Sequence, residues 1–247
     1  MGSKDITKML AFDIETTGLS ALNGDVITVI CTEDYHTRQK HAYEFARHRN
    51  SPDTLKALTD AVIAAFDAAP ALCAFNGHKF DIPFMATALS IPYEKIRAWK
   101  NKMTDILEHC RDKYQHTFSL NLLCEWNCIP IKISTGLAAV KMALDGEFDQ
   151  LKEYCEYDVT ILNNLYAKRF ILNPRNNAVM DLAIWAPYLF PEAENETPTQ
   201  KLEMQLDAKN ALDYARRRPN GQVESTPVSP ESPRKRCRLD LPHMLEG

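Results

Sequence analysis

Five residues in three separate segments have side chains that suit metal binding and the handling of water. Asp13 and Glu15 lie in LAFDIETTGL, Asp81 lies in FNGHKFDIPFM, and Tyr154 and Asp158 lie in LKEYCEYDV. Carboxylate oxygens are the ligands that Mg²⁺ and Mn²⁺ prefer. Two such ions about 4 Å apart activate water and neutralise charge when a phosphodiester is hydrolysed. These residue types therefore suit metal-assisted hydrolysis of a phosphodiester.

Apolar patterning predicts the elements that must position these side chains. Residues 8–14 read as a buried strand that ends in the first two acids, and residues 25–31 and 39–45 continue it as an antiparallel meander. Residues 51–69 predict a helix, with Ser51 as N-cap and Pro52 in the first turn. The short apolar run 71–75 then suits a buried strand after a crossover helix.

The remainder of the body, to about residue 169, is expected to be mainly helical. Strands, a helix, another strand and further helices indicate an α/β domain with a mixed central sheet flanked by helices. Asp81 follows the strand 71–75, where α/β sheets form their sites. Tyr154 and Asp158 are four residues apart on a helix, so they share one face.

Composition limits the classes of protein to which the chain can belong. The 247 residues are 45% hydrophobic with a net charge of −4, and no apolar run is long enough to span a membrane. The start of the chain lacks a signal-peptide pattern, so we expect an intracellular protein with no membrane partner. The seven cysteines suit reduced thiols. A zinc site is the weaker alternative to core packing for Cys110, Cys124, Cys128, His109 and His116.

A change in composition near residue 190 predicts a domain boundary. Residues 6–190 form the expected catalytic body, and residues 191–247 read as a polar, largely disordered tail with a helix at 201–218. The tail carries a basic cluster within 234–238 that resembles a nuclear localisation signal: Arg234, Lys235, Arg236 and Arg238. This cluster indicates a nuclear import receptor as a partner and a nuclear location. Incidental basic residues in a disordered tail fit equally well.

The three acidic segments together resemble the motifs of a known family. They match, in order and spacing, the motifs of the DEDD superfamily of 3′-to-5′ exonucleases over roughly residues 6–170. Tyr154 resembles the tyrosine type, which occurs in the proofreading domains of family B DNA polymerases and in RNase D. The histidine type has His five residues before the last aspartate, where this chain has Glu153. The resemblance implies an RNase H-like fold.

The resemblance also implies a role for each motif residue. Asp13, Glu15 and Asp158 would hold the divalent ion, Mg²⁺ or Mn²⁺, that generates hydroxide. Asp13 would bridge to a second ion, which Asp81 would reach mainly through metal-bound water. Tyr154 would orient the attacking water, because a phenol with a pKa near 10 is a poor base.

Four further residues are candidates for gripping the substrate by the same resemblance. Thr16 and Leu19 would contact the terminal nucleotide through the backbone and by wedging against its base. Asn76 and Phe80 would line the same pocket. For Leu19 and Phe80, packing in the core is an equally good interpretation.

Each acid taken alone also has an ordinary structural interpretation. Asp13 and Glu15 fit an exposed strand end, Asp81 fits a carboxylate favoured by a helix N-terminus, and Asp158 fits a solvated helix face. Together these interpretations require a coincidence at four positions. We therefore favour the metal site.

The expected activity is 3′-to-5′ hydrolysis of single-stranded or frayed nucleic acid, releasing nucleoside 5′-monophosphates, with DNA favoured over RNA. RNA 3′-end trimming or deadenylation is the first alternative, and a nucleic-acid-binding or recruitment module without catalysis is the second. The segment KIRAWKNK, 95–102, suits a basic strip in which Trp99 stacks on a base, or equally a solvated helix face. Proofreading, repair and degradation are not distinguished by these residues.

Overall fold

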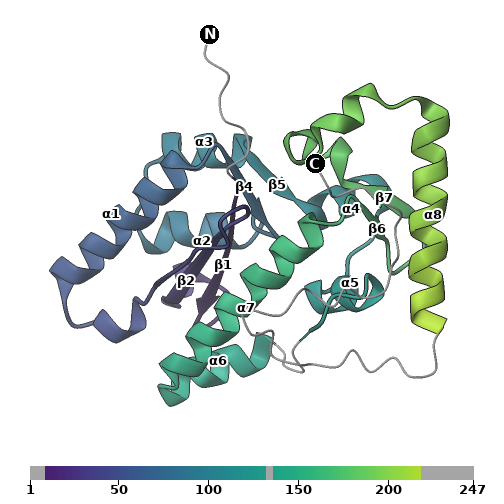
Figure 1. Cartoon of the computed structure of the whole chain (residues 1–247). Coiled ribbons are helices and arrows are strands. Elements are labelled where there is room, and N and C mark those ends of the chain that lie inside the picture. The colour runs from purple at the N-terminus through teal and green to yellow at the C-terminus, as the bar shows by residue number, and fades with distance from the viewer. Residues whose placement is uncertain (1–8, 132–135, 218–247) are drawn as a thin grey trace, which may run out of the picture.

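A mixed sheet forms the centre of the molecule. The computed structural model describes residues 9–131 and 136–217. Within them, five strands pair in the order β3-β2-β1-β4-β5, with antiparallel pairing among β1, β2 and β3 and parallel pairing from β1 through β4 to β5 (Figure 1). These strands are β1 (Met9–Thr16), β2 (Ile27–Asp34), β3 (Lys40–Tyr43), β4 (Ala71–Ala74) and β5 (Met103–Asp105).

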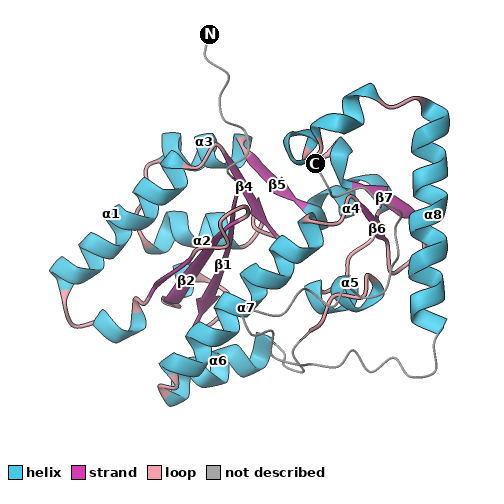
Figure 2. Cartoon of the chain, viewed as in Figure 1, coloured by secondary structure: helices cyan, strands magenta, loops and turns pink. Residues whose placement is uncertain are grey.

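Helices cover both faces of this sheet (Figure 2). The helix α1 crosses from β3 to β4, and α2 and α3 cross from β4 to β5, as parallel pairing requires. The α-helices are α1 (Pro52–Ala68), α2 (Asp81–Ala88), α3 (Tyr93–Asn101), α4 (Ile106–Tyr114), α5 (Leu120–Trp126), α6 (Gly136–Asp145), α7 (Phe148–Tyr166) and α8 (Pro198–Arg217). Short 3₁₀ helices are η1 (Ala21–Asn23), η2 (Ala46–His48), η3 (Leu182–Ile184), η4 (Pro187–Leu189) and η5 (Pro191–Asn195).

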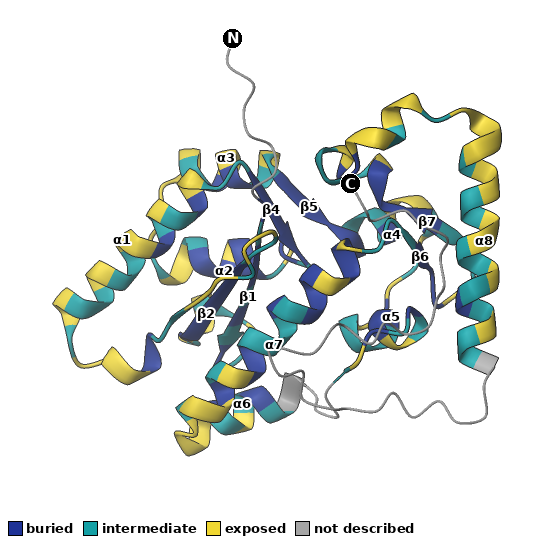
Figure 3. Cartoon of the chain, viewed as in Figure 1, coloured by how far each residue is buried: buried dark blue, intermediate teal, exposed yellow. Residues whose placement is uncertain are grey.

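Two apolar clusters divide along the faces of β1, because successive side chains of a strand point to opposite faces. Phe12 and Ile14 pack with residues of α1, α2 and α3. Met9 and Ala11 pack with residues of α4, α5 and α7. Figure 3 shows the strands of the sheet as largely buried between these layers. The next side chains on the α7 face of β1 are those of residues 13 and 15.

The expected fold class is confirmed at this level: the structure is α/β, with an antiparallel meander joined to parallel strands and flanked by helices. The strands expected at 8–14, 25–31, 39–45 and 71–75 correspond to β1, β2, β3 and β4. The expectation of a mainly helical segment to residue 169 missed β5. Its three residues are too few to show a period of their own, and they become a strand by pairing with β4.

A second, two-stranded sheet follows α7. It pairs β6 (Phe170–Leu172) with β7 (Val179–Asp181), and α8 packs against it. Arg169 and Lys201 both form ion pairs with Asp181, and Leu212 of α8 is buried. The helix expected at 201–218 appears as α8, so residues 191–217 form helices in this structure. The domain boundary near residue 190 stays a prediction.

The basic cluster at 234–238 lies outside the described residues, as does the rest of the tail beyond residue 217. The nuclear signal and the import receptor therefore stay predictions. No helix among residues 9–131 and 136–217 combines the length and apolar character that a membrane crossing requires.

Candidate functional site

The strand β1 presents two carboxylates to α7. Asp13 pairs in register with Cys31 of β2, and Glu15 pairs with Val29. The register shifts directly after Glu15, so regular pairing with β2 is interrupted at this point. The strand β1 pairs with β2 along its length and with β4 at residues 9–11. This pairing fixes the strand that carries the two carboxylates.

The helix α7 supplies the facing carboxylate. Ligand oxygens of Asp13, Glu15 and Asp158 all lie within 4.8 Å of one another, close enough to coordinate one ion. The chain order separates these residues by about 140 positions, and the packing of α7 on β1 and β2 brings them together. The structure thus assembles three of the four acids expected at the metal site.

Tyr154 lies one turn before Asp158 on α7 and is buried in the apolar cluster on that face of the sheet. Burial raises the pKa of Tyr154 well above its usual value, and the charges of Asp158, Glu15 and Asp13 raise it further. The phenol therefore remains protonated at neutral pH and is available as a hydrogen-bond donor.

Asp81 is the first residue of α2, and its side chain is buried. It is not part of the group formed by Asp13, Glu15 and Asp158. Burial raises the pKa of Asp81 to about 7. Hydrogen bonds from its own backbone N–H and from that of Ile14 lower the pKa and oppose part of this effect. Its negative charge also raises the pKa values of Asp13 and Glu15, so the carboxyl groups interact electrostatically. This position suits indirect contact with an ion.

Burial and mutual repulsion dominate the electrostatics of Asp13 and Glu15. Burial raises the pKa values of Asp13 and Glu15 well above their usual range, and neighbouring carboxylates, including Asp158, add to the effect. Among the residues that the structure describes, no lysine or arginine forms a salt bridge with Asp13, Glu15 or Asp81. Buried carboxylates are normally paired or bound to a metal. The donor set of Asp13, Glu15 and Asp158 consists of hard carboxylate oxygens and therefore fits a divalent metal ion.

A buried polar network fixes α7 against β2. Glu33 is fully buried; its carboxylate accepts hydrogen bonds from Thr160 at 2.6 Å and Asn163 at 3.2 Å, and pairs with Arg38 at 2.7 Å. Thr160 and Asn163 flank the turn of α7 that follows Asp158. The network therefore holds Asp158 in register with the acids of β1.

A second buried carboxylate shapes the turn that leads to Asp81. Asp105 accepts hydrogen bonds from the backbone N–H groups of Asn76 at 2.9 Å and His78 at 3.1 Å, and it caps α4 through Glu108 N–H. A Cβ added to Gly77 would lie 2.5 Å from the Cβ of Ala74, so only glycine fits in this turn. Asp105 thus positions the segment that begins α2.

Sequence reasoning missed both Glu33 and Asp105. For Asp105 a signal was present, since an Asp before a helix with Glu three residues later is the pattern of an N-terminal cap. That signal predicts the cap but not the bonds to Asn76 and His78. Glu33 lies at the end of an apolar run and has no local signal of burial, because its partners on α7 are about 130 residues away.

The expected substrate residues on the β1–β2 loop differ in exposure. Thr16 is buried, and its hydroxyl donates to the carbonyl of Gly18 at 2.6 Å. Leu19 is 84% exposed, which excludes core packing for its side chain. A Cβ on Gly18 would lie 2.4 Å from the carboxylate of Asp25, which itself accepts from Ser20 N–H. The loop is therefore tightly closed beneath an exposed Leu19.

The expected substrate residues before α2 are partly held by the protein. Asn76 has a positive φ of 70°, and its side-chain oxygen lies 3.4 Å from Arg111 Nη2. Phe80 is half-buried and packs against the apolar cluster of α1, α2 and α3, with its ring centre 5.7 Å from that of Phe84 and the two rings tilted by 49°. Contact between these residues and a substrate stays a prediction.

The strip at 95–102 has a structural role instead. Trp99 is fully buried and donates its indole N–H to Asp67 at 2.8 Å, while Lys95 pairs with the same carboxylate. Lys102 donates to the carbonyls of Phe66 at 2.6 Å and Ala69 at 2.6 Å, at the end of α1. Trp99 is therefore not available to stack on a base, and this expectation is wrong because α3 packs its aromatic side against α1.

The zinc alternative finds no support among the described residues. In the part of the chain that the structure describes, one group of His, Cys, Asp or Glu side chains has metal-binding geometry, and it consists of Asp13, Glu15 and Asp158. Cys110 and Cys124 are buried in the apolar cluster on the α7 face. Core packing, the favoured interpretation, accounts for them.

Comparisons with known proteins agree with this architecture. A family model described as the RNase H superfamily matches residues 10–141. The chain is similar to the family B DNA polymerase from the hyperthermophilic archaeon Pyrobaculum calidifontis, with 18% identity and a TM-score of 0.50. That similarity covers 66% of this chain and 25% of the polymerase chain, so the matched part spans a quarter of the polymerase. No curated protein sequence matches the chain. The expected RNase H-like fold is confirmed.

Proposed function

The chain belongs to the RNase H superfamily, and from this premise we propose that it is a metal-dependent 3′-to-5′ exonuclease of the tyrosine type. The observation that carries the proposal is the group of Asp13, Glu15 and Asp158, whose oxygens lie within 4.8 Å of one another. Tyr154 on the same helix face as Asp158 supports the tyrosine type.

The residues that would hold the metal follow from their positions. Asp13, Glu15 and Asp158 would hold a divalent ion directly, and Asp81 would contribute from the start of α2. Mg²⁺ and Mn²⁺ are the candidate ions because the donors are hard oxygens. When bound, two such ions supply an activated water and neutralise charge on the phosphate and the leaving oxygen.

The protein's own groups do the remaining work. Tyr154 keeps its proton and donates a hydrogen bond that orients the attacking water. The β1–β2 loop, with Thr16 at its base and Leu19 exposed, would contact the terminal nucleotide. Asn76 and Phe80, before α2, would line the opposite side. Such an enclosed acidic site admits a single strand or a frayed end.

The proposed substrate is the 3′ end of single-stranded nucleic acid, with DNA preferred, and the proposed products are nucleoside 5′-monophosphates. The motif resemblance to polymerase proofreading domains favours DNA, and the resemblance to RNase D favours RNA. The alternative is an RNA-trimming enzyme or deadenylase.

The test is a 3′-end degradation assay. Strands of DNA, mixed RNA and poly(A), of equal length and labelled at the 5′ end, are incubated with the full chain and Mg²⁺ or Mn²⁺. We expect stepwise shortening from the 3′ end that EDTA abolishes, fastest on DNA. Retained activity in both Asp13→Ala and Asp158→Ala would contradict the assignment. Strand binding that is insensitive to EDTA and yields no product would instead identify a binding module.

A further inference from the structure

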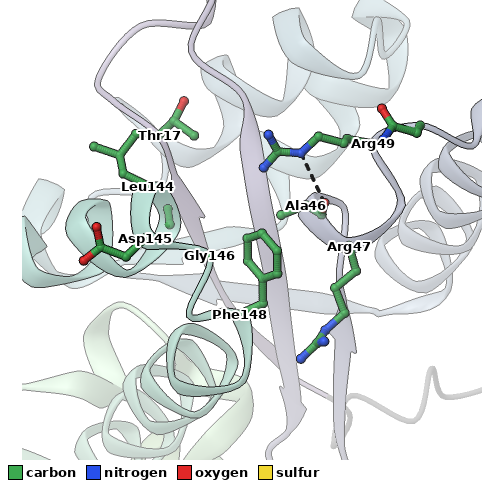
Figure 4. Close-up of a pocket in the computed structure, with 10 residues that line it drawn as sticks. Thr17, Ala46, Arg47, Arg49, Leu144, Asp145, Gly146 and Phe148 are labelled. Atoms are coloured by element: carbon green, nitrogen blue, oxygen red, sulfur yellow. Dashed lines mark hydrogen bonds between the residues drawn. The ribbon is translucent and has the colours of Figure 1, made fainter.

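A cavity of about 450 Å³ is lined in part by Thr17, the residue that follows β1 (Figure 4). Its volume is within the range of small-ligand sites, roughly 300 to 1,000 Å³. Three segments form its walls: the residue after β1, the turn around η2, and the junction of α6 and α7. The lining residues are Thr17, Ala46, Arg47, Arg49, Asn50, Ala143, Leu144, Asp145, Gly146 and Phe148.

The cavity adjoins the proposed catalytic site through the chain itself. Thr17 lines it and lies two residues after Glu15, while Phe148 begins the helix that carries Tyr154 and Asp158. Thr17 also holds the β1–β2 loop, since its backbone N–H donates to the carbonyl of Val26 at 3.0 Å. The cavity and the carboxylate site are therefore built on the same two elements, the end of β1 and α7.

The two arginines of the cavity differ in how their charge is used. Arg47 pairs with Glu44 and Asp149, and its guanidinium lies 5.9 Å from the ring centre of Phe148. Arg49 forms one hydrogen bond, from Nε to the carbonyl of Ala46 at 3.4 Å. Among the described residues, Arg49 forms no salt bridge with a carboxylate. Figure 4 shows its side chain extending over Ala46 towards the wall with Thr17 and Leu144.

The remaining charges around the cavity are largely balanced. Asp145 pairs with Lys141, and Glu44 also lies 3.9 Å from Lys152. The surplus positive charge is that of Arg49, whose planar guanidinium suits the oxygens of a phosphate. Leu144 and Phe148 give the same cavity an apolar wall on which a sugar or base can pack.

We propose that this cavity binds one nucleotide unit of the substrate strand on the 5′ side of the scissile bond, with its backbone phosphate on Arg49. The inference rests on the proposed function for its direction along the strand. It extends that function by adding a second contact between protein and strand, separate from the acids proposed to bind metal. A basic contact is needed there, because the acidic site repels the backbone of the strand it must admit.

The test is a double-mutant cycle between the protein and the strand. Binding of a fluorescent single-stranded hexadeoxynucleotide is measured with the full chain carrying Asp158→Asn, so that turnover does not interfere. Single neutral methylphosphonate linkages replace each phosphate in turn. Arg49→Ala is compared with Arg49→Lys and with Arg175→Ala, a matched control between β6 and β7, where the exposed Arg175 donates from Nε to the carbonyl of Thr117 at 3.1 Å.

We expect Arg49→Ala to weaken binding about tenfold and to lower the salt dependence, d log K/d log[salt], by about 0.7. Arg49→Lys keeps the salt dependence, and Arg175→Ala changes neither quantity. At one internal linkage the methylphosphonate weakens binding to the Arg49 protein but has no further effect on Arg49→Ala.

Three results would overturn the inference: equal effects of Arg49→Ala and Arg175→Ala, no linkage that couples to Arg49, or coupling confined to the 3′-terminal linkage. Displacement of the strand by free nucleoside monophosphate that depends on Arg49, without coupling at any linkage, would also overturn it. Because the assay measures binding, it separates the two proposals. Coupling without strand degradation would contradict the exonuclease alone, and degradation without coupling would contradict the cavity assignment alone.

Discussion

The neighbouring strands β1 and β2 both direct carboxylates towards α7, but the half-buried acids of β1 and the fully buried Glu33 of β2 have opposite surroundings. Glu33 of β2 is paired with Arg38 and hydrogen-bonded by Thr160 and Asn163. Asp13 and Glu15 of β1 face each other and Asp158, with no lysine or arginine in a salt bridge to either among the described residues. A buried charge is expensive unless it is compensated.

The difference separates a structural acid from a functional one. Glu33 has its partners within the fold, so its charge stabilises the docking of α7. Among the described residues, Asp13 and Glu15 form no salt bridge with a lysine or arginine, and the carboxylate of Asp13 accepts only a long hydrogen bond from the thiol of Cys155 at 3.8 Å. Burial and neighbouring carboxylates raise the pKa values of both acids. Sites of this kind trade stability for the ability to bind a ligand. Four predictions test this contrast.

The largest expected effect is the loss of activity in Asp13→Asn. Changes to groups that only support a metal ligand cost about 10- to 100-fold, so loss of a ligand that contacts both ions should cost more than about 100-fold in kcat/KM. Glu15→Gln should cost less, because Glu15 is expected to serve one ion. Urea unfolding of Asp13→Asn should show equal or higher stability, because repulsion is removed. A large loss of stability would contradict the contrast with Glu33.

The opposite result is expected for Glu33→Gln. The substitution removes the buried negative charge that pairs with Arg38 and accepts from the amide of Asn163 on α7. We expect the free energy of unfolding to fall by roughly 2 to 4 kcal/mol. Urea denaturation measures the change, with the exposed Glu194→Gln as a control expected within about 0.5 kcal/mol. Unchanged stability in Glu33→Gln would show that the network does not hold α7.

Metal binding should stabilise the folded protein through the acids of β1, and this stabilisation should not depend on Glu33. A free ion concentration about 100 times the Kd adds about 2.7 kcal/mol, which corresponds to a rise in Tm of roughly 5 to 10 °C. Differential scanning fluorimetry with Mg²⁺ or Mn²⁺ against EDTA measures this shift. Asp158→Asn should remove most of it, whereas Glu33→Gln should keep it. A shift of the same size in Asp158→Asn would place the ion elsewhere.

Per pH unit, the smallest expected effect is the change in stability without metal. Asp81 has a pKa of about 7 in the folded protein, above its unfolded value of about 3.9, so the folded state binds the extra proton between these values. Stability should therefore fall as pH rises from about 4 through 7, by at most about 1.4 kcal/mol per pH unit for this group. Urea unfolding in EDTA tests this, and Asp81→Asn should flatten the curve. An identical slope in Asp81→Asn would show that another group is responsible.

Local periodicity explains how much of the fold could be predicted. Runs of apolar residues at strand spacing placed β1, β2 and β4, and the capped amphipathic pattern placed α1. The three residues of β5 carry no period, and the buried side of Trp99 on α3 was read as a strip for nucleic acid. In both cases the outcome depends on a partner element that a local pattern does not show.

The sequence alone determined the types of the candidate ligands and two of their local relations. Asp13 and Glu15 share a strand face because side chains alternate, and Tyr154 and Asp158 share a helix face because they are one turn apart. Only the tertiary structure decided which carboxylates meet, which carboxylate is compensated, and where Arg49 lies. Those relations join segments that are tens to more than a hundred residues apart, so they depend on how α7 and the turn around η2 pack at the sheet.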